Sequence, residues 1–142
     1  MNPTIQKFGY PATLMRELDH WVILLRPAQV TLGSLVLAAK SDACAYADLP
    51  TEAFAEQADA VREIERVLRD FVGYDRINYL MLMMVDPHVH FHVIPRYEVA
   101  RMWEGLSFRD AGWPGPPRLD ASVKLEREQL NLLTKQIASL FR

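Results

Sequence analysis

Apolar residues along this chain follow two periods, and each period predicts a different kind of element. Three runs are apolar at nearly every position and too short for typical helices, which predicts buried strands. These runs span residues 20–25, 34–38 and 77–85. The last of them is expected to be covered on both faces, with its methionines filling the core.

Apolar residues recur every three or four positions in two longer stretches, which predicts two amphipathic helices. The first spans Thr51–Val72, with Thr51 expected as its cap and Gly73 as its end. The second covers residues of about 121–141. The stripe of the first helix is predicted to contain Phe54, Ala58, Val61, Ile64, Leu68 and Phe71.

The remaining segments carry weaker patterns. Residues 1–10 are expected to form an irregular arm, and a short helix is predicted near residues 12–17. Residues 98–118 combine Trp, Pro and Gly in an irregular order that predicts an extended loop. This segment either packs on the surface or forms a wall over a site, with Arg101 or Arg109 near phosphates and a Trp ring stacking on a base.

A fourth strand is predicted by the stretch His88-Val89-His90-Phe91-His92-Val93-Ile94-Pro95-Arg96. Because side chains alternate across a strand, the three imidazoles are expected to leave one face. The apolar residues between them are expected to pack on the other face. Pro95 lacks an amide hydrogen, so it is predicted to end the strand or to mark a sheet edge.

The elements therefore follow one another as strand, strand, long helix, strand, strand and helix. Strands joined by short turns favour antiparallel pairing, so the expected fold class is α+β. A length of 142 residues predicts a single domain, residues 1–142, with a core of its own.

Composition narrows the classes of function. The net charge of −2 gives no broad basic surface for duplex nucleic acid or for an anionic membrane. No apolar run reaches the length of a membrane span, and the first residues lack the apolar core of a secretion signal. Cys44 is the single cysteine, which excludes an internal disulfide and fits a cytoplasmic location.

The row of histidines has three interpretations. The first is chance on a solvated strand face. The second is a metal site, but His88 and His92 lie about 13 Å apart along a strand, too far to share one zinc ion. A pair would then need a third ligand such as His20, Cys44 or Glu98. The third is phosphate chemistry, in which one imidazole attacks while its neighbours and Arg96 bind phosphate oxygens.

The stretch from His88 to Arg96 closely resembles the signature of the histidine triad family of nucleotide hydrolases and transferases. This resemblance implies an antiparallel sheet with a long helix packed on it, assembled as a homodimer. It also implies that His90 is the nucleophile, which forms a covalent nucleotidyl intermediate, and that His88 and His92 orient it and bind phosphate. No cofactor and no metal bound by the histidines are implied.

The resemblance extends over residues of about 20–97 and implies further substrate-binding residues. Asn78 matches an Asn on the family's strand, and Arg96 ends the signature. Ser34 stands where the family has a histidine, and the turn before His88 lacks the family's Gly-containing phosphate loop. The expected substrates are dinucleoside polyphosphates or nucleoside phosphoramidates. The alternatives are a nucleotide-binding module with little turnover and, with less support, a protein that binds metal through its histidines.

Overall fold

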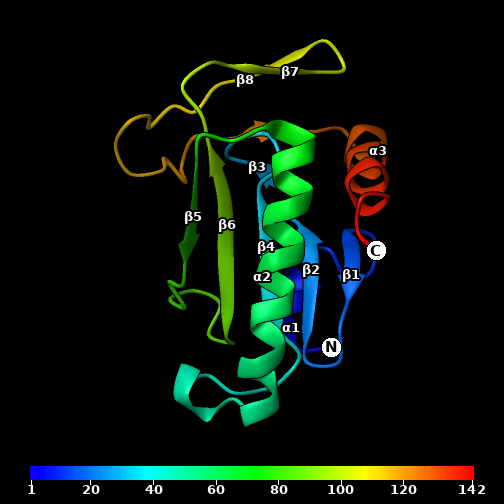
Figure 1. Ribbon diagram of the computed structural model, residues 1–142, viewed down its shortest axis with the longest axis vertical. Coiled ribbons are helices and arrows are strands. Elements are labelled where there is room, and N and C mark those ends of the chain that lie inside the picture. Colours follow the sequence, from blue (N-terminus) through cyan, green and yellow to red (C-terminus); the bar gives the residue numbers. More distant parts are fainter.

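A five-stranded antiparallel sheet forms the centre of the molecule in a computed structural model that describes residues 1–142 (Figure 1). From edge to edge, its strands are β1 (Leu14–Glu17), β2 (Trp21–Leu25), β4 (Leu35–Ala39), β6 (His90–Arg96) and β5 (Arg76–Leu80). Every neighbouring pair in this sheet is antiparallel. The α+β class and the antiparallel pairing are thereby confirmed, but residues 81–89 connect β5 to β6 where a short turn at Asp86 and Pro87 was expected.

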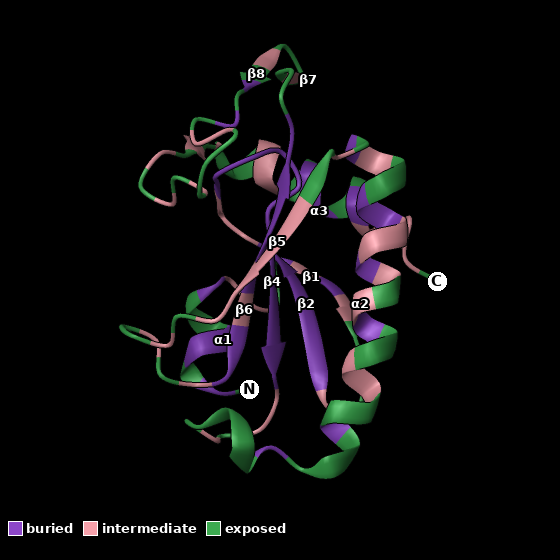
Figure 2. Cartoon of the chain, turned by 60° about the vertical axis from the view of Figure 1, so that its left-hand side comes forward, coloured by how far each residue is buried: buried purple, intermediate pink, exposed green.

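The two faces of the sheet are covered by different helices. Strands β2 and β4 are buried at every residue, so successive side chains enter two separate cores. Trp21, Ile23 and Leu37 belong to the larger core, on the side of helix α2 (Thr51–Val72). Val22 and Leu24 belong to a smaller core with Ile5 and Phe8, from helix α1 (Pro3–Lys7) and the residue after it. Figure 2 shows the buried strands between these two helices.

Helix α2 has the predicted bounds but a different cap, and its contact face differs from the predicted stripe at Phe54 and Ala58, which are exposed. Pro50 occupies the N-cap position without a side-chain bond, and Thr51 is the first helical residue. Gly73 ends the helix in the left-handed conformation, with φ +58°, as predicted. Phe54 is exposed, and its ring lies tilted against that of Tyr46, which belongs to a short 3-10 helix, η1 (Tyr46–Asp48). The buried residues of the helix are Ala53, Ala60, Ile64, Val67, Leu68 and Val72, and Val61 and Phe71 of the predicted stripe are partly buried against the same core.

The N-terminal predictions were wrong in two places. Residues 1–10 contain α1, which Asn2 caps by accepting a hydrogen bond from the Ile5 amide. The Asn2 side chain also donates to the Ala39 carbonyl oxygen, so it ties α1 to the end of β4. Residues 14–17 form β1 rather than a helix, because pairing with β2 satisfies this backbone as an edge strand.

The C-terminal third contains more strand than its irregular sequence predicts. Strands β7 (Arg101–Trp103) and β8 (Leu106–Phe108) form a hairpin beyond one end of the large sheet (Figure 1). Strand β9 (Val123–Lys124) pairs with β3 (Ala28–Gln29). The last helix, α3 (Arg127–Ala138), is shorter than predicted and is stabilised by a capping box between Glu126 and Gln129.

The predicted strand over residues 77–85 ends early. Strand β5 stops at Leu80, and the next residues form an irregular segment in which Met84 is 85% exposed and Val85 is 83% exposed. Strand β6 continues through Pro95 to Arg96, although its pairing with β4 stops at Val93. None of the helices has the length and apolar character needed to cross a membrane.

Candidate active site

The histidine face of β6 opens into a cavity of about 410 Å³. Its walls come from five parts of the chain, which meet only in the folded molecule. The lining residues are Lys7, Phe8, Arg26, Leu82, Met83, Met84, Val85, Asp86, His90, His92 and Leu119. The cavity therefore joins two predicted catalytic histidines to residues that the sequence motif does not contain.

His90 has one ring nitrogen engaged and one free. Its Nδ1 lies 2.7 Å from the carbonyl oxygen of His88. A carbonyl oxygen only accepts, so Nδ1 carries the proton in this hydrogen bond, and the Nε2 atom of the neutral ring keeps its lone pair. The imidazole is 2% exposed and lies against Phe8, with ring centroids 5.7 Å apart. This arrangement gives His90 the tautomer required of a nucleophile at Nε2.

His92 has the opposite tautomer. Arg26 donates through Nε to His92 Nδ1 at 3.2 Å, so the proton of the neutral ring is on Nε2. Burial lowers the pKa of His92 to about 4, and the positive charge of Arg26 and the neighbouring His90 contribute to this shift. The two imidazoles lie with centroids 5.1 Å apart. The cavity thus places the Nε2 atom of His90 beside the neutral N–H donor of His92.

His88 differs from the other two histidines, because β6 begins only at His90. His88 lies in the bend before the strand, so the strand was predicted to begin two residues too early, but its imidazole still lies on the α1 side of the sheet, as those of His90 and His92 do. Its Nδ1 is 2.9 Å from Thr4 Oγ1 on α1, while its carbonyl oxygen accepts from His90. The His88 side chain does not line the cavity.

Two cations of the cavity were missed at the sequence level. Lys7 forms an ion pair with Asp86, at 2.8 Å, and so connects α1 to the irregular segment before His88. Arg26 donates to His92 and to the Ala28 carbonyl oxygen, and burial lowers the pKa of its guanidinium. Strand alternation is the sequence pattern that could have identified Arg26. Val22 and Leu24 lie on the side of the sheet that carries the histidines, and Arg26 is the next residue in this alternation.

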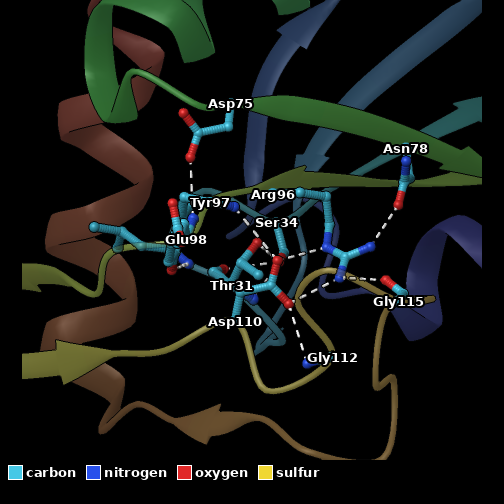
Figure 3. A network of polar contacts seen from close by, with 11 residues as sticks. Thr31, Ser34, Asp75, Asn78, Arg96, Tyr97, Glu98, Asp110, Gly112 and Gly115 are labelled. Carbon is cyan, nitrogen blue, oxygen red and sulfur yellow. Dashed lines mark hydrogen bonds and ion pairs between the residues drawn. The ribbon is translucent and has the colours of Figure 1, made fainter.

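Arg96 belongs to a different network at the far end of β6 (Figure 3). Its Nε and Nη2 atoms donate to the Asp110 carboxylate at 2.6 and 3.0 Å, and Nη1 donates to Asn78 Oδ1 at 2.8 Å. Nη2 also donates to the Gly115 carbonyl oxygen. The network therefore holds the segment around Asp110 against the sheet.

The predicted substrate-binding residues Ser34, Asn78 and Arg96 all lie outside the histidine cavity. The Ser34 hydroxyl is buried, accepts from the Thr31 amide at 3.0 Å and donates to the Thr31 carbonyl oxygen at 2.8 Å. It stabilises the turn before β4. Asn78 is held by Arg96, so the structure brings these two residues together but separates them from His90.

Residues 98–118 do not line the histidine cavity either. Arg101 donates to the carbonyl oxygens of Val72 and Gly73, at the C-terminus of α2. Trp103 is buried and donates to Gln136 on α3. No three His, Cys, Asp or Glu side chains lie close enough together to hold a metal ion.

Comparison by sequence finds no matching family model and no matching curated protein. Solved structures match over nearly the whole chain. A histidine triad protein from Bradyrhizobium japonicum has a TM-score of 0.75 at 16% identity, covering 100% of this chain and 97% of that one. One from Marinobacter aquaeolei has a TM-score of 0.73 at 20% identity, covering 96% and 93%.

The diadenosine triphosphate hydrolase of Plasmodium falciparum is a third match, with a TM-score of 0.66 at 11% identity. The alignment covers 96% of this chain and 92% of the hydrolase. At these identities the likeness concerns the fold, and it agrees with the one implied by the stretch from His88 to Arg96. The chain has the histidine triad fold.

Proposed function

We propose that this protein is a nucleotide hydrolase or nucleotidyl transferase in which His90 attacks the α-phosphate of its substrate. The observation that carries this proposal is the bond from His90 Nδ1 to the His88 carbonyl oxygen, which leaves the Nε2 lone pair available. The fold shared with a diadenosine triphosphate hydrolase supports the same class of reaction.

In the proposed reaction, His90 Nε2 forms a bond to phosphorus while the bond from phosphorus to the leaving group breaks. The electron pair of that bond departs with the leaving group. Water then attacks the phosphorus of the nucleotidyl-histidine, and the phosphorus–nitrogen bond breaks to restore the His90 lone pair. The attacking water gives up one proton, which balances the proton that an amine leaving group takes up. The neutral His92 Nε2–H supplies a hydrogen bond to a phosphoryl oxygen as charge develops there.

The substrates proposed for this site are dinucleoside polyphosphates or nucleoside phosphoramidates, with purines preferred, as the resemblance implies. His88 would act mainly through its backbone, because its carbonyl oxygen sets the tautomer of His90. The same proposal includes that the protein assembles as a homodimer and is located in the cytoplasm. This chemistry requires no cofactor, because the chain itself supplies the attacking atom, His90 Nε2, and a hydrogen-bond donor to the phosphoryl oxygen, His92 Nε2–H.

Intact-mass spectrometry tests the proposal directly. Wild-type protein, His90→Asn and the control His20→Asn are mixed briefly with diadenosine tetraphosphate or adenosine phosphoramidate and then quenched. His20 lies outside the cavity, so it is a matched histidine control. We expect a transient gain of one adenylyl group on wild type and His20→Asn but not on His90→Asn. Full turnover by a folded His90→Asn variant would refute the proposal.

A nucleotide-binding module with little turnover is the second candidate. It is favoured by one observation: four consecutive apolar residues, Leu82–Val85, form a wall where polar groups would otherwise stabilise a charged transition state. This candidate predicts that AMP binds while neither substrate releases product. The mass experiment and a titration with AMP separate the two functions.

A further inference from the structure

Arg26 carries a positive charge that the protein itself does not neutralise. No carboxylate lies within 4.0 Å of its guanidinium, although six other ion pairs form in the molecule. Nε donates to His92 and Nη1 donates to Ala28, so both Nη2 hydrogens and one on Nη1 have no protein partner. A partly buried charge without a counter-charge is unfavourable, and this one lines a cavity.

The other cation of the cavity is in a different situation. Lys7 donates to both carboxylate oxygens of Asp86, at 2.8 and 3.0 Å, and its side chain is largely exposed. Its charge is therefore already compensated. An anion that enters the cavity meets one free guanidinium fork, and forks of this kind bind phosphate with two parallel hydrogen bonds.

The strand register places Arg26 beyond His92 as seen from His90. Leu24 pairs with Val36, and Val36 pairs with His92, so β2 and β6 run in the same direction with Leu24 level with His92. Arg26 follows Leu24 by two residues and reaches back to His92 Nδ1. Along the strand direction, His92 therefore lies between Arg26 and His90. A guanidinium two strand positions beyond Leu24 is placed to bind a group other than the phosphoryl group that reacts at His90.

We infer that Arg26 recognises a second phosphate of the substrate, distinct from the phosphoryl group that reacts at His90. The inference rests on the proposed function for the identity of the first phosphate. The second phosphate belongs either to the phosphate chain, as in a polyphosphate, or to the ribose, as in a nucleoside bisphosphate. Both sources present negatively charged non-bridging phosphoryl oxygens to the guanidinium.

Isothermal titration with non-reacting ligands distinguishes these sources. AMP is compared with ADP, used as its non-cleavable α,β-methylene analogue, and with adenosine 2′,5′- and 3′,5′-bisphosphate, on wild type, Arg26→Gln and the control Arg76→Gln. Arg76 is exposed and lies outside the histidine cavity, so its loss removes the same charge elsewhere. We expect at least one two-phosphate ligand to bind wild type about tenfold more tightly than AMP. That preference is lost in Arg26→Gln and retained in Arg76→Gln.

Tighter binding of ADP assigns the second phosphate to the chain, and tighter binding of a bisphosphate assigns it to the ribose. Equal affinities in wild type, or a preference that survives in folded Arg26→Gln, overturn the inference. A parallel loss of affinity for AMP and for the two-phosphate ligands also overturns it, because Arg26 would then only position His92. Arg26→Lys, which keeps the charge and loses the fork, replaces Arg26→Gln if the latter does not fold, and is expected to retain part of the preference.

These titrations require no turnover, so they are independent of the mass experiment. A preference that depends on Arg26 together with no adenylyl adduct would leave the inference standing for a binding module. An adduct on His90 together with equal affinities would overturn the inference alone.

Discussion

Replacing Asp110 by alanine is expected to lower the free energy of unfolding by about 3–5 kcal/mol, because it leaves the Arg96 guanidinium buried without its counter-charge. The side chains of Arg96 and Asp110 are 5% and 1% exposed. The Asp110 carboxylate accepts two bonds from Arg96, one from the Tyr97 amide at 3.4 Å and one from the Gly112 amide at 3.2 Å. These three donor groups lose four hydrogen bonds together, and only Arg96 Nη2 keeps a second acceptor, the Gly115 carbonyl oxygen.

A second variant separates charge from hydrogen bonding. Asp110→Asn keeps one oxygen acceptor but removes the negative charge, so the expected loss is smaller, about 1–3 kcal/mol. Asp120→Ala is the control, because the ion pair between Arg118 and Asp120 is exposed to solvent and its removal is expected to cause no measurable change.

Urea denaturation followed by far-ultraviolet circular dichroism at pH 7 measures these differences. A loss below about 1 kcal/mol for Asp110→Ala would refute the conclusion that this pair is desolvated and holds residues 98–118 on the sheet. The folded variant should still bind AMP as wild type does, since neither Arg96 nor Asp110 lines the histidine cavity. A selective loss of AMP affinity would instead support the substrate-binding role predicted for Arg96 from the sequence.

Three further substitutions test other parts of the structure. The pKa of His92 falls from 6.5 to about 4 on folding, so the unfolded chain binds more protons between these values. Stability should therefore decrease by up to about 3 kcal/mol as the pH falls from 6.5 to 4, and urea titrations of His92→Gln should lack this decrease. Phe8→Ala removes a ring packed on both His90 and His92 and should cost about 3–5 kcal/mol in the same assay; a cost near zero would contradict the docking of α1. Gly33→Ala should cost about 1–3 kcal/mol, because φ is +92° and the added Cβ lies 3.2 Å from Leu68 Cδ2; an unchanged melting temperature would refute this strain.

Local periodicity was sufficient for the elements whose environment is uniform along their length. The bounds of helix α2 were predicted because its apolar residues recur every three or four positions over 22 residues and because a glycine suited to the left-handed conformation follows it. Most of β6 was predicted because every second residue is apolar and packs toward α2. The tautomers of His90 and His92 could not be predicted, since they depend on which atom meets each Nδ1.

Elements that depend on distant partners were missed. Helix α1 has five residues, too few to be stable alone, and it is held by bonds from Asn2 to Ala39 and from Thr4 to His88. Strand β1 is formed by pairing with β2. The contacts of α1 join residues separated by 37 and 84 positions, so no local sequence pattern predicts them.

The apolar run over residues 77–85 shows why the cavity itself escaped prediction. A run that is apolar at nearly every position is typical of a strand buried on both faces, but it fits equally well a strand followed by an apolar wall. Strand β5 uses the first four of these residues, and the wall uses Leu82–Val85. By contrast, Arg26 follows a buried strand at the position whose side chain points to the histidine face, and an arginine there breaks the apolar alternation. If the alternation of side chains along β2 is continued two residues beyond Leu24, it places Arg26 on the histidine face. Arg26 is therefore a site residue outside the histidine motif that the sequence itself indicates.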